Sequence, residues 1–298
     1  MNILVTGASG QLGRILSKKI LDEKIPFLGL DIRKEDSIDG KMIHSEITDS
    51  TDLKKHASKL EEIDTLIHLA SLITNDKDVI KSGPDSVELN IKGTMNLLKF
   101  LPNLKKIIFS STYMVYGTPN QNPVTENHST NPNVVYGASK LSTEKYLQIY
   151  CKEKEISLSI LRMMGVYNVK KPHGQAIPTF VKMIANDERP TIVGTGEIKR
   201  NHLYIDDAID SIMTALKNTK SEIYNIGGRD APSNLQLIEM INEAMNKKIQ
   251  PVFKESKTSP YDFITDISKA EKELGFVPKI GIKEGIGKTI KNYLENPW

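Results

Sequence analysis

Two residues in the middle of the chain, Tyr136 and Lys140, have types and a spacing that suit proton transfer. They stand four residues apart in the sequence YGASK, inside a stretch with a helical pattern. Because positions i and i+4 of a helix share one face, the phenol and the ammonium are expected to be neighbours. The ammonium would stabilise a phenolate, which could take a proton from a hydroxyl while hydride leaves the same carbon. Tyrosine and lysine at this spacing also occur as simple surface pairs, and the preceding strand decides between the two interpretations.

That strand pattern ends in three hydroxyl side chains, Ser110, Ser111 and Thr112, about one loop before Tyr136. Open α/β sheets bind substrates beyond the carboxyl ends of their strands. Thr112 is therefore placed to hydrogen-bond a reacting oxygen while Tyr136 handles its proton. The alternative is that the three hydroxyls only satisfy backbone groups at the end of the strand.

A cluster of three glycines follows the first strand pattern. Gly7, Gly10 and Gly13 lie in TGASGQLG, directly before a helical pattern. Glycines at this spacing let the backbone approach a pyrophosphate, which the N–H groups of the helix N-terminus bind. Asp31 ends the second strand pattern, 18 residues after Gly13, where a carboxylate accepts the ribose hydroxyls of NAD and repels a 2′-phosphate. Arg33 could receive that phosphate, but Asp31 favours NAD over NADP.

The elements that position these residues alternate between apolar strands and helical patterns. Strands are expected at Ile3–Thr6, Phe27–Asp31, Thr65–Ala70, Lys106–Ser111 and Leu158–Met163. Helices are expected between them, at Gln11–Glu23, Ser50–Leu60, Ser86–Phe100 and Val134–Lys152. Strands separated by helices indicate parallel βαβ units, and apolar runs without alternation indicate strands buried on both faces. The predicted fold is therefore α/β, a Rossmann-type doubly wound parallel sheet.

The pattern changes after about Arg162, where a loop at 172–174 precedes a second series of elements. Helices are expected at Ala176–Asn186, Asp206–Leu216, Ser233–Met245, Ser268–Leu274 and Ile282–Tyr293, and a strand followed by a turn at Pro190–Gly196. We predict a dinucleotide-binding domain over 1–163, joined by about 200–222. The remainder, 164–298, is predicted to be mainly a smaller α/β substrate-binding lobe.

Composition narrows the class of protein. Hydrophobic residues make up 39% and charged residues 26%, which is typical of a globular chain. The formal net charge of +3 gives no reason to expect nucleic acid, and no apolar stretch approaches the length of a membrane span. The single cysteine, Cys151, cannot form an internal disulfide, and no metal site is predicted. The expected location is the cytoplasm.

Taken together, these residues resemble the extended short-chain dehydrogenases, the NAD-dependent epimerase/dehydratase group, and within it UDP-glucose 4-epimerase-like proteins. The resemblance covers nearly the whole chain in the family's order. Besides the glycine turn and YGASK, it rests on HLA at 68–70, NIKGT at 90–94, SSTYMVYG at 110–117, LR at 161–162, RNHLYIDD at 200–207, YNIG at 224–227, DISKA at 266–270 and LG at 274–275.

The resemblance implies a role for each matching position. Thr112, Tyr136 and Lys140 match the catalytic triad, and Thr112 and Tyr136 would also contact substrate. The residues implied to hold NAD are Gly7, Gly10, Gln11, Leu12, Gly13, Asp31, Arg33, Glu46, Ile47, Leu69, Ala70, Ser71, Asn90, Ser110, Tyr136, Lys140 and Met163. Glu46 and Ile47 would face adenine, and Asn90 would be structural or adjacent to the cofactor.

The implied substrate contacts lie in the second half of the chain. Arg200 matches the arginine that grips the nucleotide diphosphate in sugar-modifying members, because a guanidinium donates to two phosphate oxygens at once. Gln175 and Thr179 are further candidates for contacts with a nucleotide sugar. Outside this context, all three would be interpreted as ordinary surface residues.

Some positions depart from the family's pattern. Gly165 replaces an asparagine and Asn168 a glycine. A second diphosphate-binding arginine is missing from the segment 254–262, so the grip is weaker, absent, or rebuilt from Lys254, Lys257 or Arg229.

A further departure concerns the chemistry itself. Dehydratases of the family carry acidic residues directly after the catalytic serine or threonine. Tyr113 and Met114 occupy those positions here and cannot protonate a leaving hydroxyl, which disfavours dehydration.

The predicted function is NAD-dependent epimerisation of a nucleotide-activated sugar through a transient keto-sugar, with hydride returned to the opposite face. Tyr136 would remove the hydroxyl proton, at a carbon such as C4, and Thr112 would stabilise the carbonyl oxygen. The alternatives are an NAD(P)-dependent ketoreductase or dehydrogenase acting on a nucleotide sugar or small alcohol, and a dinucleotide-binding sensor without turnover. The family also implies a homodimer that pairs through the helices containing Asn90–Phe100 and Tyr136–Cys151, although the protein's own lobes could cover those faces.

Overall fold

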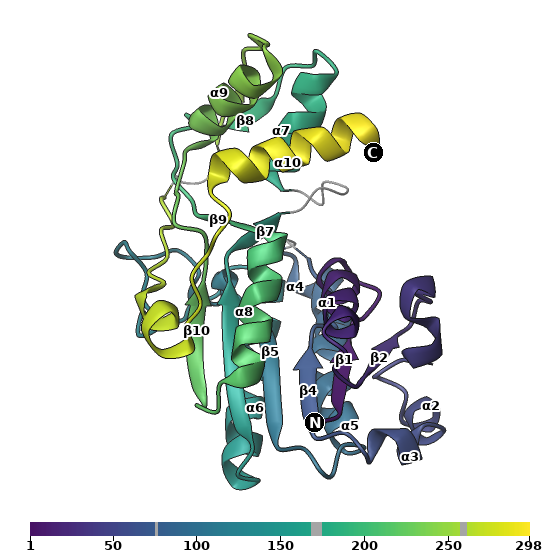
Figure 1. The fold of residues 1–298 in the computed structure, drawn as a ribbon. Helices are drawn as coiled ribbons and strands as arrows, with labels where there is room; N and C mark the ends of the chain where they lie inside the picture. The colour runs from purple at the N-terminus through teal and green to yellow at the C-terminus, as the bar shows by residue number, and fades with distance from the viewer. Residues whose placement is uncertain (75–76, 168–174, 257–260) are drawn as a thin grey trace. The chain divides into compact units, whose positions relative to one another are not determined.

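The structure is a computed structural model that describes residues 1–74, 77–167, 175–256 and 261–298 (Figure 1). The chain divides into two compact units. Unit 1 comprises Met1–Gly117, Ser129–Arg162 and Ile212–Tyr224, and unit 2 comprises Thr118–His128, Met163–Ser211 and Asn225–Trp298. The expected loop at 172–174, and with it Asn168 and Lys257, lies outside the described residues.

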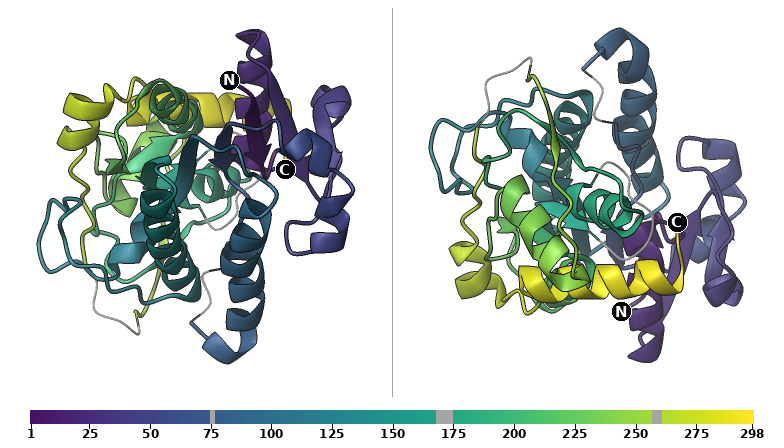
Figure 2. Two further views of the ribbon diagram at one scale, coloured as in Figure 1. Left: turned by 90° about the horizontal axis from the view of Figure 1, so that it is seen from below. Right: turned by 90° about the horizontal axis from the view of Figure 1, so that it is seen from above.

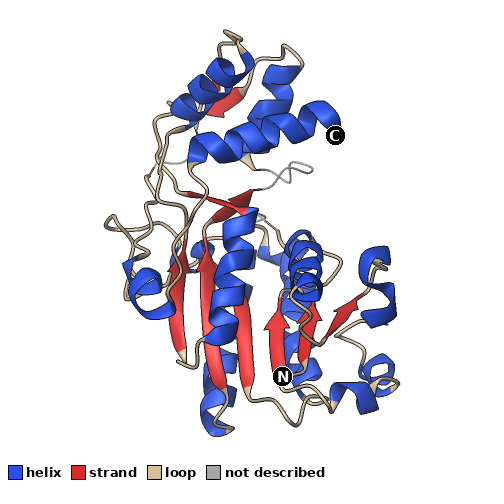
Figure 3. Ribbon diagram, viewed as in Figure 1, coloured by secondary structure: helices blue, strands red, loops and turns tan. Residues whose placement is uncertain are grey.

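Unit 1 is built on a seven-stranded parallel sheet with the strand order β10-β6-β5-β4-β1-β2-β3 (Figure 3). The strands are β1 (Ile3–Thr6), β2 (Phe27–Asp31), β3 (Met42–His44), β4 (Thr65–His68), β5 (Lys106–Thr112), β6 (Ser157–Met163) and β10 (Glu222–Ile226). Every residue of β1 and β4 is buried, as expected for strands that are covered on both faces. The predicted α/β fold with a Rossmann-type parallel sheet is confirmed.

The helices of unit 1 lie on both faces of this sheet, with α1 in front and α5 and α6 behind in the view of Figure 1. The α-helices are α1 (Gln11–Asp22), α2 (Ser50–Lys54), α3 (Ala57–Leu60), α4 (Val79–Ser86), α5 (Thr94–Leu98) and α6 (Val135–Glu153). Two 3-10 helices, η1 (Asp36–Lys41) and η3 (Tyr113–Tyr116), and one π-helix, η2 (Val87–Gly93), complete the unit.

Two helical predictions were wrong in their extent. The expected helix Ser50–Leu60 is two short helices, interrupted at Lys55 and His56. The expected helix Ser86–Phe100 begins earlier, because Asp78 caps α4 by accepting hydrogen bonds from the N–H groups of Ile80 and Lys81. It then continues through η2 and α5 and ends at Leu98.

Unit 2 contains shorter elements. They are β7 (Gly165–Tyr167), α7 (Ala176–Ala185), β8 (Thr191–Val193), β9 (His202–Tyr204), α8 (Ile205–Lys217, which continues into unit 1), α9 (Asn234–Met245), β11 (Val252–Lys254), the π-helix η4 (Ala270–Leu274) and α10 (Ile282–Glu295). β7 pairs with β9, and β8 pairs with β11, both in parallel. Figure 2 shows α7, α9 and α10 packed together. Across the described ranges, none of the helices is long and apolar enough to span a membrane.

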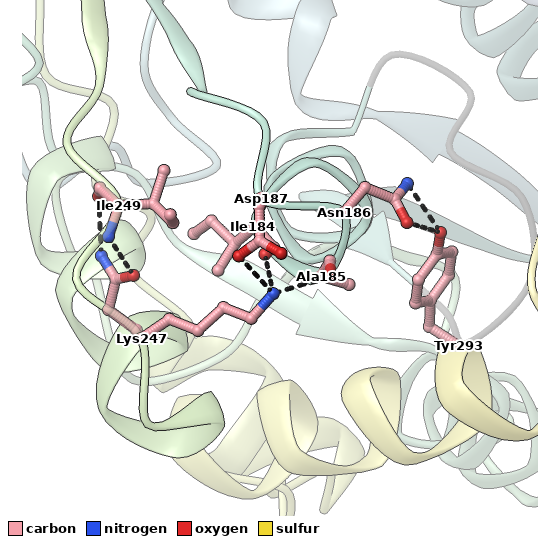
Figure 4. A network of polar contacts seen from close by, with 8 residues as sticks. Ile184, Ala185, Asn186, Asp187, Lys247, Ile249 and Tyr293 are labelled. Atoms are coloured by element: carbon pink, nitrogen blue, oxygen red, sulfur yellow. Dashed lines mark hydrogen bonds and ion pairs between the residues drawn. The ribbon is translucent and has the colours of Figure 1, made fainter.

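Polar contacts tie the ends of these helices together (Figure 4). The ammonium of Lys247, which follows α9, donates to the carbonyl oxygens of Ile184 and Ala185 at 2.8 and 2.7 Å, and to the carboxylate of Asp187. A cation at this place satisfies the last carbonyl groups of α7 and interacts favourably with the negative end of the helix dipole. Asn186 and Tyr293 exchange a second contact, which links α7 to α10.

Candidate active site

The glycine turn that connects β1 to α1 is tightly packed. Gly7 has a φ of 68°, and its N–H donates to the carbonyl oxygen of Leu30. A Cβ on Gly7 would approach the backbone nitrogen of Ala70 to 2.8 Å, and a Cβ on Gly13 would approach the Gly7 oxygen to 2.0 Å. Gly10 is the N-cap of α1 and has no side chain with which to cap it. The first-turn N–H groups, including those of Gln11 and Leu12, are therefore suited to an anion.

Asp31, at the end of β2, is buried beside this turn. Its Oδ2 accepts from the N–H of Ser9 at 3.0 Å, and its Oδ1 accepts from the N–H of Arg33 at 2.9 Å. The Arg33 guanidinium also lies 3.5 Å from Oδ1 while remaining largely exposed. These bonds fix the carboxylate and leave further lone pairs for the hydroxyls of a ribose. Of the two residues implied to face adenine, Ile47 is buried and Glu46 is exposed.

Hydrogen bonds that involve Thr6 and His68 fix the segment after β4. The N–H groups of Leu69 and Ala70 both donate to the Thr6 hydroxyl oxygen at 3.2 Å. The Thr6 hydroxyl is 2.7 Å from Nδ1 of His68, whose Nε2 is 2.8 Å from the Thr94 hydroxyl. The strand predicted to reach Ala70 ends at His68, because these N–H groups bond a side chain instead of a neighbouring strand.

Asn90 anchors the same segment to the catalytic helix. Its Oδ1 accepts from the Ser71 hydroxyl at 3.0 Å and from the Leu72 N–H at 2.7 Å. Its Nδ2 donates to the Leu72 oxygen at 3.1 Å, to the Ser139 hydroxyl on α6 at 2.9 Å and to Ser86 at 3.3 Å. With both ends of the amide engaged, the side chain acts as a structural link between η2, the segment after β4, and α6.

The three residues matched to the catalytic triad are all buried in unit 1. Thr112 is the last residue of β5, and its hydroxyl oxygen accepts from the N–H of Met114 at 3.3 Å. Tyr136 and Lys140 lie on α6, which packs against β5 and η3. The Lys140 ammonium lies 4.1 Å from the centre of the Phe109 ring and 6.0 Å from that of Tyr136. Ser110 is half-buried and Met163 is buried at the ends of β5 and β6.

Burial dominates the proton affinities of this pair. It raises the pKa of the Tyr136 phenol to about 12, and a hydrogen bond with Ser71 opposes part of the rise. It lowers the pKa of the Lys140 ammonium to about 7, while the carboxylate of Glu144 opposes that fall. The shift for Tyr136 is opposite in direction to the one expected from the spacing of the pair, because burial disfavours the charged phenolate.

The residues matched to contacts with the nucleotide sugar beyond the triad, Gln175, Thr179 and Arg200, belong to unit 2. Gln175 precedes α7 and donates to the carbonyl oxygen of Val166 at 2.6 Å, and Thr179 is partly buried one turn later. The backbone of Arg200 forms an isolated parallel β-bridge with that of Phe263. The Arg200 guanidinium lies 5.6 Å from the ring centre of Tyr261, and the sequence did not indicate this neighbour.

Two of the cations considered as replacements for the missing arginine lie within the described residues. Lys254 is exposed on β11, and Arg229 is also exposed but forms an ion pair of 2.8 Å with Glu271.

Sequence reasoning missed a buried ion pair behind the catalytic residues. Glu144 on α6 and Arg162 on β6 are 0% and 2% exposed and lie 2.7 Å apart. Arg162 belongs to the LR motif at 161–162, for which the sequence indicates no role. Glu144 follows Lys140 by the same four residues that separate Lys140 from Tyr136. That repeated spacing is the signal that could have found it.

Comparison with known proteins agrees with this geometry. The family model "NAD dependent epimerase/dehydratase family" matches residues 3–227. The dTDP-4-dehydro-6-deoxyglucose reductase of Escherichia coli is 32% identical, with 97% of this chain and 96% of the relative covered. A UDP-glucose 4-epimerase structure from Thermotoga maritima is 28% identical, covers 99% of both chains and has a TM-score of 0.90. A UDP-glucuronic acid 4-epimerase from Bacillus cereus, in complex with NAD, is 29% identical over 99% of both chains, with a TM-score of 0.86. The chain belongs to the NAD-dependent epimerase/dehydratase family of enzymes.

Proposed function

We propose that this protein is an NAD-dependent epimerase of a nucleotide-activated sugar. The observation that carries the proposal is a buried Thr112, Tyr136 and Lys140 at the end of β5 and on α6, with Tyr113 and Met114 where a dehydratase would need acids. Two similar proteins support the choice of reaction, since the Thermotoga maritima structure is a UDP-glucose 4-epimerase with UDP-glucose and the Bacillus cereus one is a UDP-glucuronic acid 4-epimerase.

The residues of unit 1 fit NAD. A Cβ at Gly7 or Gly13 would strike backbone atoms, so glycine at these positions keeps the turn tight and α1 close to β1, as a pyrophosphate-binding turn requires. Asp31, fixed by two backbone N–H groups, would hold the adenosine ribose, and its negative charge disfavours a 2′-phosphate. NAD, when bound, accepts and returns the hydride of the reacting carbon.

The protein's own groups would handle the proton. Tyr136 takes the proton of the sugar hydroxyl into its phenolate oxygen, and the Lys140 ammonium lowers the cost of holding that negative charge. Thr112 donates a hydrogen bond to the oxygen as it becomes a carbonyl. After the keto-sugar has turned, Tyr136 returns the proton to the same oxygen, so the reaction needs no net proton.

For the nucleotide diphosphate we propose Arg200, with Gln175 and Thr179 as further contacts. The guanidinium offers a planar fork for two phosphate oxygens. Replacing Arg200 with lysine keeps the charge and removes the fork, so we expect a higher KM with little change in kcat. The same rise in KM after Lys254→Ala would identify the residue that replaces the missing arginine.

The test of the reaction is to incubate the protein with UDP-glucose, UDP-glucuronic acid, and dTDP- and GDP-sugars, and to resolve the products by NMR. An epimerase forms product with NAD in catalytic amount and shows no net NADH. Tyr136→Phe should strongly reduce product formation, whereas Tyr146→Phe, on the exposed face of the same helix, should not. Product that requires stoichiometric cofactor would refute epimerisation.

One finding favours a second candidate, a nucleotide-sugar ketoreductase. The Escherichia coli reductase is 32% identical over nearly its whole length. The same triad can deliver a proton to a ketone oxygen in a net reduction. A keto-sugar substrate that consumes one NADH per molecule would establish this alternative.

We also propose a homodimer. Exposed apolar side chains on neighbouring helices of unit 1 support this proposal: Val79 and Ile80 on α4, Val87 on η2, and Tyr146 and Ile149 on α6. Exposed apolar surface of this kind is suited to an interaction with another protein chain. Within the expected Asn90–Phe100 segment, by contrast, Leu97 and Leu98 are buried in the core. Ile149→Asp should produce a monomer by sedimentation, whereas Leu294→Asp, an exposed site in unit 2, should not.

A further inference from the structure

The buried ion pair between Glu144 and Arg162 is not among the groups proposed to transfer the proton. The Glu144 Oε1 accepts from Nε of Arg162 at 3.1 Å, and Oε2 accepts from Nη2 at 2.7 Å. The guanidinium also stacks over the Tyr116 ring at 4.8 Å from its centre. Burying two such charges is costly unless their geometry is good, and a bidentate pair is the arrangement that compensates best.

Glu144 lies on the helix that carries two of the triad residues and contacts the neighbour of the third. Tyr136, Lys140 and Glu144 follow one another at intervals of four residues, so they line one buried face of α6. Glu144 also accepts a hydrogen bond from the hydroxyl of Ser111, the residue directly before Thr112. Glu144 therefore belongs to the helix that carries Tyr136 and Lys140, and its carboxylate contacts the end of the strand that carries Thr112.

The charges of this cluster do not cancel while Tyr136 is protonated. Lys140 and Arg162 supply two positive charges and Glu144 one negative charge, all buried. Ionisation of the phenol makes the cluster neutral. An excess positive charge in a desolvated place favours the phenolate, on condition that Lys140 keeps its proton.

We propose that Glu144 and Arg162 are positioning residues that keep Lys140 protonated beneath Tyr136 and hold Thr112 in register with them. Arg162 fixes the carboxylate, and the carboxylate in turn acts on Lys140 and Ser111. The proposal rests on the proposed function only for the roles of Thr112, Tyr136 and Lys140. The contacts themselves are independent of the substrate.

The other groups that face Lys140 do not replace this carboxylate. On α6 it meets the phenol of Tyr136, and on β5 it lies over the Phe109 ring. On β4 the nearest titratable group is His68, and burial together with the Lys140 charge lowers the pKa of that imidazole to about 3. His68 is therefore neutral at physiological pH. Glu144 is the group that raises the pKa of Lys140 against the effect of burial.

The experiment compares Glu144→Gln, Glu144→Asp and the double variant Glu144→Gln/Arg162→Met in the full chain without substrate. The titration of the Lys140 ammonium is followed by NMR of lysine-labelled protein, with its signal assigned from Lys140→Arg. In Glu144→Gln we expect the midpoint to fall by about one pH unit or more. Glu144→Asp keeps the charge and should stay close to the original protein.

The double variant separates charge from packing. Removing both partners should restore much of the stability that Glu144→Gln loses, because no buried charge is left without a partner. The Lys140 midpoint should recover only in part, because the Arg162 charge no longer opposes the ammonium but the carboxylate is still missing. A Lys140 midpoint that is unchanged in Glu144→Gln, or that recovers fully together with stability in the double variant, would overturn the proposal.

Turnover supplies the second measurement. The alkaline limb of kcat/KM should shift to lower pH in Glu144→Gln by the same amount as the Lys140 titration. Displaced titration in a protein that epimerises none of the nucleotide sugars would contradict the proposed function and leave the role of Glu144 intact. Displaced titration with an unmoved limb in an active enzyme would show that Lys140 does not set that limb and would overturn the link to catalysis.

Discussion

Replacing Gly13 with alanine tests whether the turn after β1 has the close packing that a bound pyrophosphate needs. The new Cβ would lie 2.0 Å from the Gly7 oxygen, 2.7 Å from the Ala8 Cα and 2.8 Å from the Ala8 carbonyl carbon. All three are backbone atoms, so no change of rotamer relieves the contact and the turn itself must shift. Overpacking of this kind costs about 1–3 kcal/mol, against a gain of about 1 kcal/mol from the better helix propensity of alanine.

We therefore expect Gly13→Ala to lose up to about 2 kcal/mol of unfolding free energy and to bind NAD at least about tenfold more weakly, since tenfold corresponds to about 1.4 kcal/mol. Calorimetric titration with NAD and denaturant unfolding measure the two effects. Gly287→Ala is the matched control, because within the described part of the chain no atom outside the local backbone of α10 lies within 4 Å of its Cβ, and it should gain about 0.5–1 kcal/mol. A Gly13→Ala protein with unchanged NAD affinity and unchanged stability would refute the reasoning.

Three further predictions concern the triad, unit 2 and acid stability. Tyr136→Phe should reduce turnover by about 10²–10⁴-fold with NAD affinity retained, as measured by product formation and calorimetry. Gly285→Ala should lower the thermal midpoint, because its Cβ would lie 1.8 Å from the hydroxyl oxygen of the buried Tyr167. Burial lowers the pKa of His68 to about 3 and of His202 to about 4, from 6.5. Unfolded histidines take up protons below pH 6.5 while the folded ones do not, so stability should fall as the pH drops, by roughly 2 kcal/mol per histidine between pH 6.5 and 5.

Each of these has a distinct contrary result. Substantial turnover in Tyr136→Phe would mean that another group carries the proton. An unchanged thermal midpoint in Gly285→Ala would mean that Tyr167 moves aside, despite its edge-on contacts with Tyr204 and His202. Unfolding free energies that do not decrease from pH 6.5 to 5 in urea would show that the two imidazoles are protonated in the folded state.

The strands that the sequence predicted best are β1 and β2, which have the predicted bounds, because each is a short apolar run that ends at a glycine turn or a charged residue. The strands that were missed are β3 and β10 at the two sheet edges, and β7, β9 and β11 in unit 2. Four of these five have only three residues, too short for a periodic pattern to emerge.

In the candidate site, the sequence predicted contacts within one element but not contacts between elements. Contacts along one element follow from spacing, so Tyr136 and Lys140 were predicted to share a face of a helix. Contacts between elements depend on strand order and depth, which local pattern does not contain. Glu144 meets Arg162 across 18 residues of sequence, and Asn90 meets Ser139 across 49. The direction of the Tyr136 pKa shift was missed for the same reason, because it depends on how deeply the phenol is buried.

The assignment of residues to the two units leads to one more prediction. The residues proposed for chemistry, Thr112, Tyr136 and Lys140, belong to unit 1, whereas Arg200 belongs to unit 2. Charge changes at Arg200 should therefore alter the KM for a nucleotide sugar without moving the titration of Lys140, which responds to Glu144 beside it. Comparing Arg200→Gln, which removes the charge, with Glu144→Gln in both measurements tests this separation. If Arg200→Gln displaces the Lys140 midpoint as far as Glu144→Gln does, the proton affinity of the triad is not set within unit 1, and the proposed role of the buried ion pair is wrong.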